Sequence, residues 1–460
     1  MHVTFSGAAR EVTGSCHLLT VGEHTVALDC GMFQGRRSLA REKNAKLPFP
    51  PERLSAIILS HAHIDHAGRL PLLTRHGFNG TIWATSASRD LCAIMLADSA
   101  HIQEKDAEYL RRHGRDAVDP LYTQADIGPL MQQMVGEPYG KTFPVVPGVR
   151  ATFVDAGHIL GSASVILECK EKRRTRRLVF SGDVGRWGLP IIRDPQPPKG
   201  ADYVIMESTY GDRDHAPVAG MRERLATIVR DTAARGGRVL IPAFAVGRTQ
   251  EIVYDLHALA RERRMPAIPI YIDSPLAVDA TSVFGMHPEV FDKTEGLVQL
   301  VQDLFRFELL HYTRDVADSK ALNTQRGPMI VISPSGMCEV GRILHHLHNG
   351  ASDPRNTIII PGFQAEGTLG RCIVERRDTL RIFGDDVPLR ARVEVLNGYS
   401  AHADRNELAR WLDAVRSGSK RAPPVALVHG EPPAQETLAA SLAGRGYKVQ
   451  MPAPGDRAEL

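Results

Sequence analysis

The stretch Ser60-His61-Ala62-His63-Ile64-Asp65-His66 carries three histidines and one aspartate within six positions. It follows the apolar run Ala56-Ile57-Ile58-Leu59, which predicts a short buried strand. Gly68 interrupts the pattern, and we expect a helix to begin near Arg69 or Pro71. The four polar side chains would then follow a strand end, where loops often carry functional groups. Imidazole and carboxylate groups at this density indicate a metal site.

The chain of 460 residues exceeds the size of one ordinary hydrophobic core, so two or three domains are expected. A hydrophobic content of 43% and a charged content of 24% are typical of a soluble globular protein. The net charge of +3 permits an anionic partner without requiring one. The sequence shows no membrane span and no signal peptide, and its six scattered cysteines indicate free thiols. We therefore expect a cytoplasmic protein without membrane association.

Strand patterns fill the first part of the chain. Apolar runs alternate with glycine-centred turns over residues 2–30, which predicts antiparallel strands, and the pattern returns over residues 149–207. Three strand ends in the second region carry His158, Asp183 and Glu207, and a later strand at 424–428 leads to His429. These positions can supply the ligands that the 60–66 stretch lacks.

The middle of the chain has a different pattern. From residue 212 to about 390, helical and strand-like segments alternate with spacings that predict βαβ units and a parallel sheet. This region contains neither GxGxxG nor GxxxxGK[ST], so no nucleotide cofactor is expected. The first pattern is predicted to resume at a strand over 392–396, before a helix at about 404–416.

The spacing within the 60–66 stretch favours a catalytic metal site over a structural one. His61 and His63 can converge on one ion from an extended or turning backbone but not from a helix, where residues two apart diverge. Asp65 and His66 could serve a second ion. A structural zinc site would usually contain cysteine, and none is local. Two metal ions suit the in-line attack of water on a phosphodiester.

Two other segments have simpler explanations. His345-His346-Leu347-His348 is predicted to lie within a helix, where its histidines face different sides and belong to a solvated or packed helix. The basic run from Lys170 to Arg177 lies between two predicted strands. It is either a solvated hairpin tip or an RNA contact.

The stretch at 60–66, with Asp29 before it and His158 and Asp183 after it, resembles the signature of the metallo-β-lactamase superfamily. Further segments resemble the motifs of its β-CASP group, the nucleic-acid-processing branch; they are Glu207–Gly211, Pro242–Glu251, Ser333–Met337, Gly362–Gly370 and Ser400–Asp404. The resemblance is to short bacterial members that lack additional domains. It implies an α/β fold, with an αββα metallo-β-lactamase sandwich over residues 1–211 and 391–460. A doubly wound parallel-sheet β-CASP domain is inserted over residues 212–390.

The resemblance also implies a site with two zinc ions, or manganese as the alternative metal. The implied metal ligands are His61, His63 and His158 for one ion, Asp65, His66 and His429 for the other, and Asp183 between them. Asp29 would orient the site without binding metal. The implied catalytic residues are Asp65, Asp183, Glu207 and His402. Histidine at position 429 resembles the RNA-processing members of the group more than the DNA-repair members.

The implied activity is hydrolysis of single-stranded RNA to 5′-phosphate and 3′-hydroxyl products, by endonuclease or 5′-exonuclease action, from a monomer or homodimer. His402, held by Glu207, would protonate the leaving 3′-oxygen. The expected RNA contacts are Arg248, Ser335, Gly336, Gly367 and Thr368. Helix capping is the alternative role for the last four, and an interdomain ion pair is the alternative for Arg248.

Three alternative functions remain. One is a small-molecule metallo-hydrolase of lactamase or thioesterase type, and another is a DNA-processing β-CASP nuclease. The third, a non-catalytic RNA-binding scaffold, is disfavoured because such proteins usually lose metal ligands, and all seven implied ligands are present here.

Overall fold

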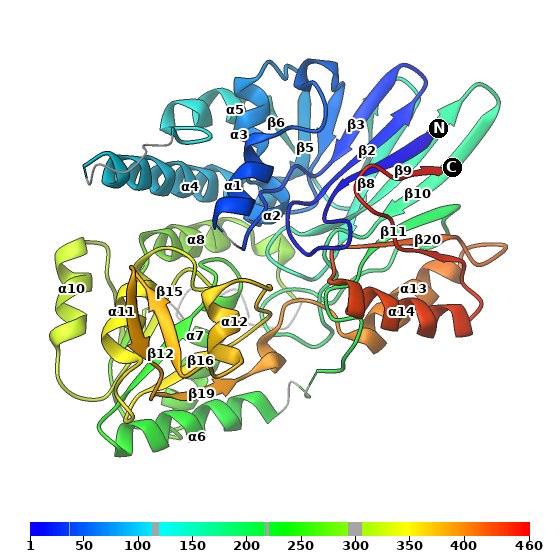
Figure 1. Ribbon diagram of the computed structural model, residues 1–460. Coiled ribbons are helices and arrows are strands. Elements are labelled where there is room, and N and C mark those ends of the chain that lie inside the picture. Colours follow the sequence, from blue (N-terminus) through cyan, green and yellow to red (C-terminus); the bar gives the residue numbers. More distant parts are fainter. Residues whose placement is uncertain (36, 113–118, 216, 218–219, 293–305) are drawn as a thin grey trace. The chain divides into compact units, whose positions relative to one another are not determined.

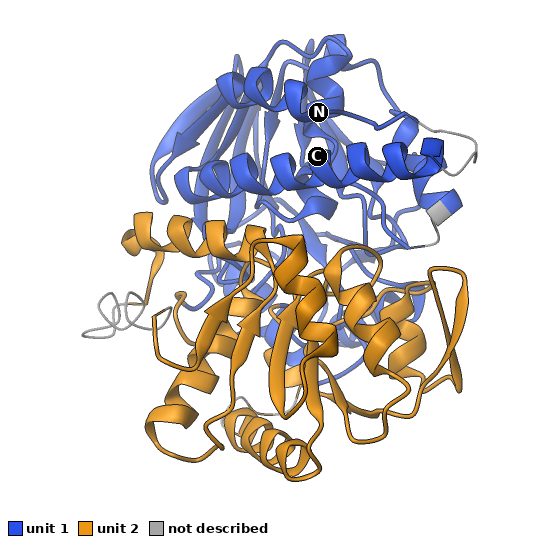
Figure 2. Cartoon of the chain, turned by 90° about the vertical axis from the view of Figure 1, so that its left-hand side faces the viewer, with its two compact units in different colours: residues 1–187, 194–214, 402–460 blue, residues 188–193, 215–401 orange. Residues whose placement is uncertain are grey.

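A computed structural model describes the chain except for residues 36, 113–118, 216, 218–219 and 293–305 (Figure 1). The chain divides into two compact units (Figure 2). Unit 1 contains residues 1–187, 194–214 and 402–460, and unit 2 contains residues 188–193 and 215–401. Unit 2 is therefore inserted into the sequence of unit 1.

Unit 1 is built on two seven-stranded sheets. The first has the order β22 (Arg457–Glu459), β1 (His2–Gly7), β2 (Cys16–Val21), β3 (His24–Leu28), β4 (Ala56–Ile58), β5 (Thr81–Thr85) and β6 (Met134–Glu137). The second has the order β21 (Val449–Gln450), β20 (Val425–Val428), β11 (Tyr203–Glu207), β10 (Arg174–Phe180), β9 (Ala163–Glu171), β8 (Val149–Asp155) and β7 (Thr142–Val146). The predicted antiparallel pairing of the first three strands is confirmed by the registers of β1 with β2 and β2 with β3.

The core of unit 1 lies between these sheets. Phe5 and Leu28 of the first sheet and Phe153 and Phe180 of the second belong to one buried cluster. Helices cover the outer faces: α3 (Leu70–Arg75), α4 (Ser86–Arg112) and α5 (Ile127–Gln133) lie on the first sheet, and α13 (Arg405–Arg416) and α14 (Pro432–Gly444) on the second (Figure 1). Central strands such as β4 and β11 are buried along their whole length because both of their faces are covered. The predicted αββα sandwich is confirmed.

Strand direction brings several strand ends to one edge of each sheet. β3 and β4 are parallel, as are β10, β11 and β20. β8 runs in the same direction as β10, because both are antiparallel to β9. The polar residues that follow these strands are thereby placed near one another.

Unit 2 is built on a six-stranded parallel sheet. Its order is β14 (Leu310–Tyr312), β13 (Ile270–Ile272), β15 (Met329–Ser333), β12 (Arg238–Pro242), β16 (Thr357–Ile360) and β19 (Arg392–Val395). Its helices are α6 (Met221–Ala234), α7 (Arg248–Arg261), α8 (Pro275–Met286), α10 (Val316–Thr324), α11 (Arg342–Gly350) and α12 (Leu369–Val374). One face of the sheet packs on α11, α12 and the hairpin β17 (Thr379–Ile382) and β18 (Asp385–Pro388). The predicted doubly wound parallel architecture is confirmed.

The structure differs from the sequence-based expectation in three places. The strand predicted at 392–396 does not return to the first part of the fold, because β19 pairs with β16 and unit 2 continues to Ala401. The helical segments predicted over 276–322 are interrupted by β14, and residues 293–305 lie outside the described part. The prediction did not include the short strands β5, β6 and β7 or the β17–β18 hairpin. No helix among the described residues is long and apolar enough to cross a membrane.

Candidate metal centre

The polar residues that follow the strand ends of unit 1 form one buried cluster. Its members come from six segments of the chain and have ligand-type atoms close together. They form three groups, within each of which those atoms lie within 4.8 Å of one another: His61, His63, His158 and Asp183; Asp65, His66 and His429; and Asp183, Glu207, His402 and His429. Asp183 and His429 each belong to two groups, so the cluster is continuous.

The first group is a set of imidazole nitrogens around one carboxylate oxygen. Nδ1 of His63 lies 3.1 Å from Nε2 of His61 and 3.1 Å from Nε2 of His158. Oδ2 of Asp183 lies 3.4 Å from the His61 nitrogen and 3.5 Å from the His158 nitrogen. Around a tetrahedral zinc ion with bonds of about 2.0–2.1 Å, neighbouring ligand nitrogens are about 3.3 Å apart. The donor types and their spacing therefore fit one zinc-sized ion.

The second group shares Asp183 with the first. Nε2 of His66 lies 3.1 Å from Nε2 of His429 and 3.3 Å from Oδ2 of Asp183. Nε2 of His429 lies 3.5 Å from Asp65 Oδ2 and 3.7 Å from Asp183 Oδ1. Asp183 Oδ1 accepts no hydrogen bond from the described residues, although it is buried. This arrangement fits a second ion with Asp183 between the two.

Local backbone contacts hold the 60–66 stretch in place. Asp65 and His66 lie on the one-turn helix α2 (Ile64–Ala67), which was not predicted, whereas the helix predicted near Arg69 or Pro71 is confirmed as α3, with Arg69 as its N-cap. The loop after β3 clamps this turn, because Cys30 donates its N–H to the carbonyl of His66 at 2.8 Å. Gly31 allows the close approach, since a Cβ atom there would lie 1.5 Å from the Asp65 carbonyl oxygen.

Asp29 lies directly behind the cluster. Its Oδ2 is 2.7 Å from Nδ1 of His66, and its two oxygens accept hydrogen bonds from the Ser60 N–H at 2.7 Å and the Ser60 hydroxyl at 2.9 Å. The carboxylate is completely buried. Contact with the ring nitrogen that faces away from the cluster orients His66 Nε2 toward Asp183 and His429.

Glu207 and His402 form a pair beside the cluster. Nδ1 of His402 lies 3.2 Å from both oxygens of Glu207 and 3.9 Å from Oδ2 of Asp183. Glu207 is fully buried at the end of β11 and also accepts hydrogen bonds from the Val184 N–H and the Thr209 hydroxyl, each at 2.6 Å. The His402 side chain remains 17% exposed, so it can meet a substrate.

Burial and charge divide the histidines into two kinds. Burial lowers the pKa of His61 well below its usual range and that of His63 to about 4. Burial also acts to lower the pKa of His66, but the carboxylates of Asp183 and Asp29 outweigh it and raise that pKa. The pKa of His402 is raised in the same way, because Glu207 and Asp183 outweigh burial. The raised pKa suits His402 to proton donation, whereas that of His66 reflects the two carboxylates that face its ring nitrogens, Asp29 at Nδ1 and Asp183 at Nε2.

Sequence reasoning did not assign roles to two supporting hydroxyl groups. Ser60 links Asp29 to the cluster, and its hydroxyl lies 3.0 Å from Nδ1 of His61. The Thr209 hydroxyl donates to Glu207 and lies 3.0 Å from Nδ1 of His429. Ser60 directly follows a predicted strand and Thr209 lies three residues after another, and each stands within two positions of a candidate site residue, which was the available signal.

The residues predicted to contact RNA all lie in unit 2. Arg248 begins α7 and forms a buried ion pair with Glu251 on the same helix. Thr368 is the N-cap of α12, where its hydroxyl accepts the Arg371 N–H, as the capping alternative anticipated.

The other predicted RNA contacts lie in turns. The Ser335 hydroxyl accepts a hydrogen bond from the Glu339 N–H at 3.1 Å. Gly336 packs against the Phe244 ring, which a Cβ atom would approach to 2.7 Å. Gly367 is exposed, with a φ of +79°.

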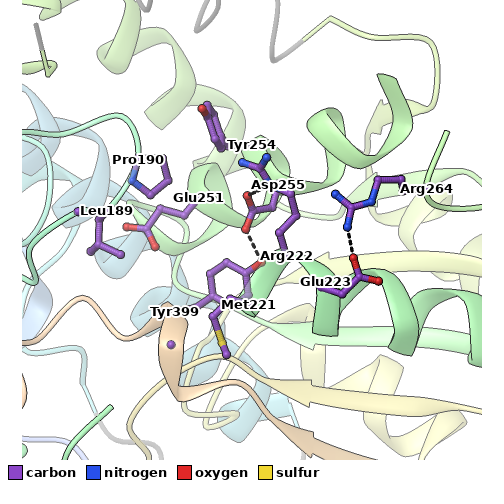
Figure 3. Close-up of a pocket in the computed structure, with 12 residues that line it drawn as sticks. Leu189, Pro190, Met221, Arg222, Glu223, Glu251, Tyr254, Asp255, Arg264 and Tyr399 are labelled. Carbon is purple, nitrogen blue, oxygen red and sulfur yellow. Dashed lines mark hydrogen bonds and ion pairs between the residues drawn. The ribbon is translucent and has the colours of Figure 1, made fainter. Parts of the chain in front are cut away.

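Unit 2 also contains a pocket of about 400 Å³ between α6, α7 and the short helix η5 (Asn397–Tyr399) (Figure 3). Its polar groups are already paired: the Tyr399 hydroxyl donates to Asp255 at 2.6 Å, Arg222 donates to the same carboxylate at 2.8 Å, and Arg264 pairs with Glu223. These ion pairs leave little charge available to a ligand.

An αββα sandwich with a His/Asp cluster at its strand ends defines a metallo-hydrolase of the metallo-β-lactamase type. Comparison with family profiles agrees. Residues 9–204 match the metallo-beta-lactamase superfamily, residues 249–373 match the Beta-Casp domain, and residues 386–452 match the Zn-dependent metallo-hydrolase RNA specificity domain.

Named relatives define the family more closely. The chain is 39% identical over 452 residues to ribonuclease TTHA0252 of Thermus thermophilus, covering 98% of each chain. It is 32% identical to transcription termination factor FttA of Pyrococcus abyssi, covering 96% of this chain and 68% of that protein. The chain belongs to the β-CASP ribonuclease family of the metallo-β-lactamase superfamily. A crystal structure of a protein of unknown function from Enterococcus faecalis V583 shares the fold, with a TM-score of 0.53 at 11% identity over 100% of this chain and 99% of that one.

Proposed function

We propose that this protein is a metal-dependent ribonuclease that hydrolyses phosphodiester bonds of single-stranded RNA and leaves 5′-phosphate and 3′-hydroxyl ends. The observation that carries the proposal is the buried His/Asp cluster of unit 1 with the Glu207–His402 pair beside it. The RNA specificity domain matched by residues 386–452 and the relative named as a ribonuclease support RNA as the substrate.

We propose two zinc ions, with manganese as an alternative. The proposed ligands are His61, His63, His158 and Asp183 for one ion, and Asp65, His66, His429 and Asp183 for the other. The near-tetrahedral spacing of the nitrogens in the first group supports this assignment. When bound, such ions lower the pKa of water and stabilise negative charge on a phosphoryl group.

Residues of the chain orient the ligands, supply negative charge and transfer a proton. Asp29 fixes the orientation of the His66 ring, and Asp65 and Asp183 provide the negative charge that a dication site needs. His402 acts as the general acid toward the leaving 3′-oxygen. Glu207 holds His402 by Nδ1, which leaves Nε2 to carry the transferred proton.

Unit 2 is proposed to bind the RNA strand. Arg248, Ser335, Gly336, Gly367 and Thr368 are the proposed contacts, through the Arg248 side chain and the turns that precede α11 and α12. The accessible turn at Gly367 supports a backbone contact to phosphate. The ion pair of Arg248 and the capping bond of Thr368 mean that these two side chains also stabilise unit 2 itself.

The proposal is tested with 5′- and 3′-labelled single-stranded RNA, and with DNA of the same sequence. The metal is first removed by a chelator and then restored as zinc or manganese. We expect RNA cleavage that depends on metal, and the two labels distinguish endonuclease from 5′-exonuclease action. Equal cleavage of DNA would indicate a DNA-processing nuclease. Hydrolysis of a β-lactam or a thioester without RNA cleavage would indicate a small-molecule hydrolase.

A further inference from the structure

The hairpin of β9 and β10 carries a basic surface that the proposed chemistry does not use. Cys169 is the last β9 residue to pair with β8, and residues 170–175 continue past the start of that strand (Figure 1). Lys170, Arg174 and the turn residues Lys172 and Arg173 are exposed. The hairpin therefore presents its charged side chains at the end of the sheet.

The charge of this hairpin is out of proportion to that of the chain. Residues 170–177 contain six Lys or Arg and one Glu, a net charge of +5. The whole chain carries only +3, so all its other residues together carry −2. A generally basic protein would not show this contrast, and concentrated positive charge attracts polyanions.

Most of these positive charges have no ion-pair partner in the part of the chain that the structure describes. Among the described residues, no carboxylate lies within ion-pair distance of Lys170, Lys172, Arg173 or Arg174. The single acid of the hairpin, Glu171, accepts the Gly22 N–H at 2.8 Å. By contrast, three exposed bases in the second half of α4, Lys105, Arg111 and Arg112, each pair with a carboxylate. A merely solvated surface has no need to leave like charges together unpaired.

We propose that this hairpin, residues 170–177, binds the phosphate backbone of an RNA strand that extends beyond the cleavage site. The proposal rests on the ribonuclease function proposed above. β10 begins in the basic hairpin and leads directly to Asp183 of the metal centre. At about 3.3 Å per strand residue, Arg173 and Asp183 are roughly 30 Å apart.

Because of this separation, the contribution of the hairpin to binding should depend on the length of the RNA. A stacked strand rises about 3.4 Å per nucleotide, so roughly nine nucleotides separate the reacting phosphate from the hairpin. Lysine and arginine contacts to phosphate do not read base identity. The hairpin should therefore strengthen binding of long RNA of any sequence and leave short RNA unaffected.

The test replaces Lys170, Lys172, Arg173 and Arg174 together with serine. The matched control replaces Lys46, Lys105, Arg111 and Arg112 of unit 1 with serine; these are exposed bases that pair with carboxylates. KM is measured for RNAs of about 6 and about 30 nucleotides over about 50–300 mM salt. For the hairpin variant we expect KM of the long RNA to rise about tenfold or more at low salt. The slope of log KM against log salt should fall by about 3, since each phosphate contact on a single strand contributes about 0.7.

The expected pattern also includes an unchanged KM for the short RNA and an unchanged KM for both RNAs with the control variant. An equal loss on both RNA lengths, an equal loss with the control, or no loss on the long RNA would each overturn the proposal. So would a variant that binds long RNA normally but no longer binds vesicles rich in anionic lipid. If the unaltered protein cleaves neither RNA, the proposed function fails, and fluorescence anisotropy with the long RNA still tests the hairpin.

Discussion

Two histidine-rich stretches of this protein have opposite roles. His61-Ala62-His63-Ile64-Asp65-His66 follows a strand of unit 1, and its imidazole nitrogens approach one another and Asp183. His345-His346-Leu347-His348 lies within α11 of unit 2, as predicted; His346 is buried, whereas His345 and His348 both lie on the side of Phe383. The His345 ring lies 4.6 Å from the Phe383 ring, whereas His348 pairs with Asp385.

The partners of the buried histidine show the contrast best. His346 lies 2.7 Å from Asp273 and 3.0 Å from the amide oxygen of Asn323. Asp273 also accepts hydrogen bonds from Arg342 and Ser319. Both polar atoms of the His346 ring are thus satisfied within the protein, and none is left for an ion. The density of histidine does not make a metal site; the direction in which the backbone points the nitrogens does.

His61→Ala should show the largest difference between the two histidine-rich stretches. We expect the variant to lose bound metal and at least about a thousandfold in kcat/KM, which corresponds to ~4 kcal/mol of transition-state stabilisation. His345→Ala is the matched control and should keep both metal and activity. Metal content by mass spectrometry and initial rates on RNA check the prediction. Equal metal loss in the two variants would contradict the assignment of the metal site to the 61–66 stretch.

His402→Gln separates proton donation from metal binding. Removal of a general acid should lower kcat about 10²- to 10⁴-fold on RNA, while the metal content stays the same. The loss should be much smaller with a 4-nitrophenyl phosphodiester, because that leaving group departs without a proton. A similar loss on both substrates would contradict the assigned role.

Asp29→Asn tests whether orientation of His66 matters for metal binding. Loss of the charged partner of a ligand histidine typically lowers metal affinity about 10- to 100-fold. We expect activity at limiting zinc to fall by that amount and to recover in excess zinc. Asp119→Asn, a change at an exposed carboxylate, is the control and should leave the zinc dependence unchanged. A loss that excess zinc does not repair would place Asp29 in the chemistry itself.

His346→Ala should affect stability and leave catalysis intact. The change removes a partner of Asp273, which is completely buried, and should lower the free energy of unfolding by about 2–4 kcal/mol. Calorimetry of thermal unfolding measures the loss, and kcat per folded molecule should be unchanged. His345→Ala, at an exposed position of the same helix, should change stability by less than about 0.5 kcal/mol.

His17 provides a third environment, buried and without a hydrogen-bond partner for either ring nitrogen among the described residues. Burial lowers its pKa to about 3. Below about pH 6.5 the unfolded chain therefore takes up a proton that the folded protein does not. As the pH falls from about 6.5 to about 3, the free energy of unfolding should therefore decrease by up to about 1.4 kcal/mol per pH unit. His17→Leu should remove this part of the pH dependence, which urea unfolding at several pH values measures. If the free energy of unfolding depends on pH equally in both proteins, the prediction is contradicted.

Much of this fold could be predicted from sequence because its signals are local. Helical spacing over residues 86–113 anticipated α4, and alternating apolar runs anticipated β1 to β3. The proximity of His158, Asp183 and His429 to the 60–66 stretch also follows from strand ends, although their role as ligands remains a prediction. Strands β6 and β7 were not anticipated because Gly136 and Pro144 interrupt their apolar runs, and both residue types are unfavourable within a strand.

The available chemistry could be predicted from local sequence, because residue type and spacing in HxHxDH set both the donor atoms and their backbone direction. The exact partners of distant groups depended on the folded chain. The folded chain brought Asp29 behind His66, placed Glu207 against His402, assigned β19 to the sheet of unit 2, and paired His346 of α11 with Asp273, which follows β13. Such pairings depend on sheet order and on burial across hundreds of residues, and no local pattern encodes them.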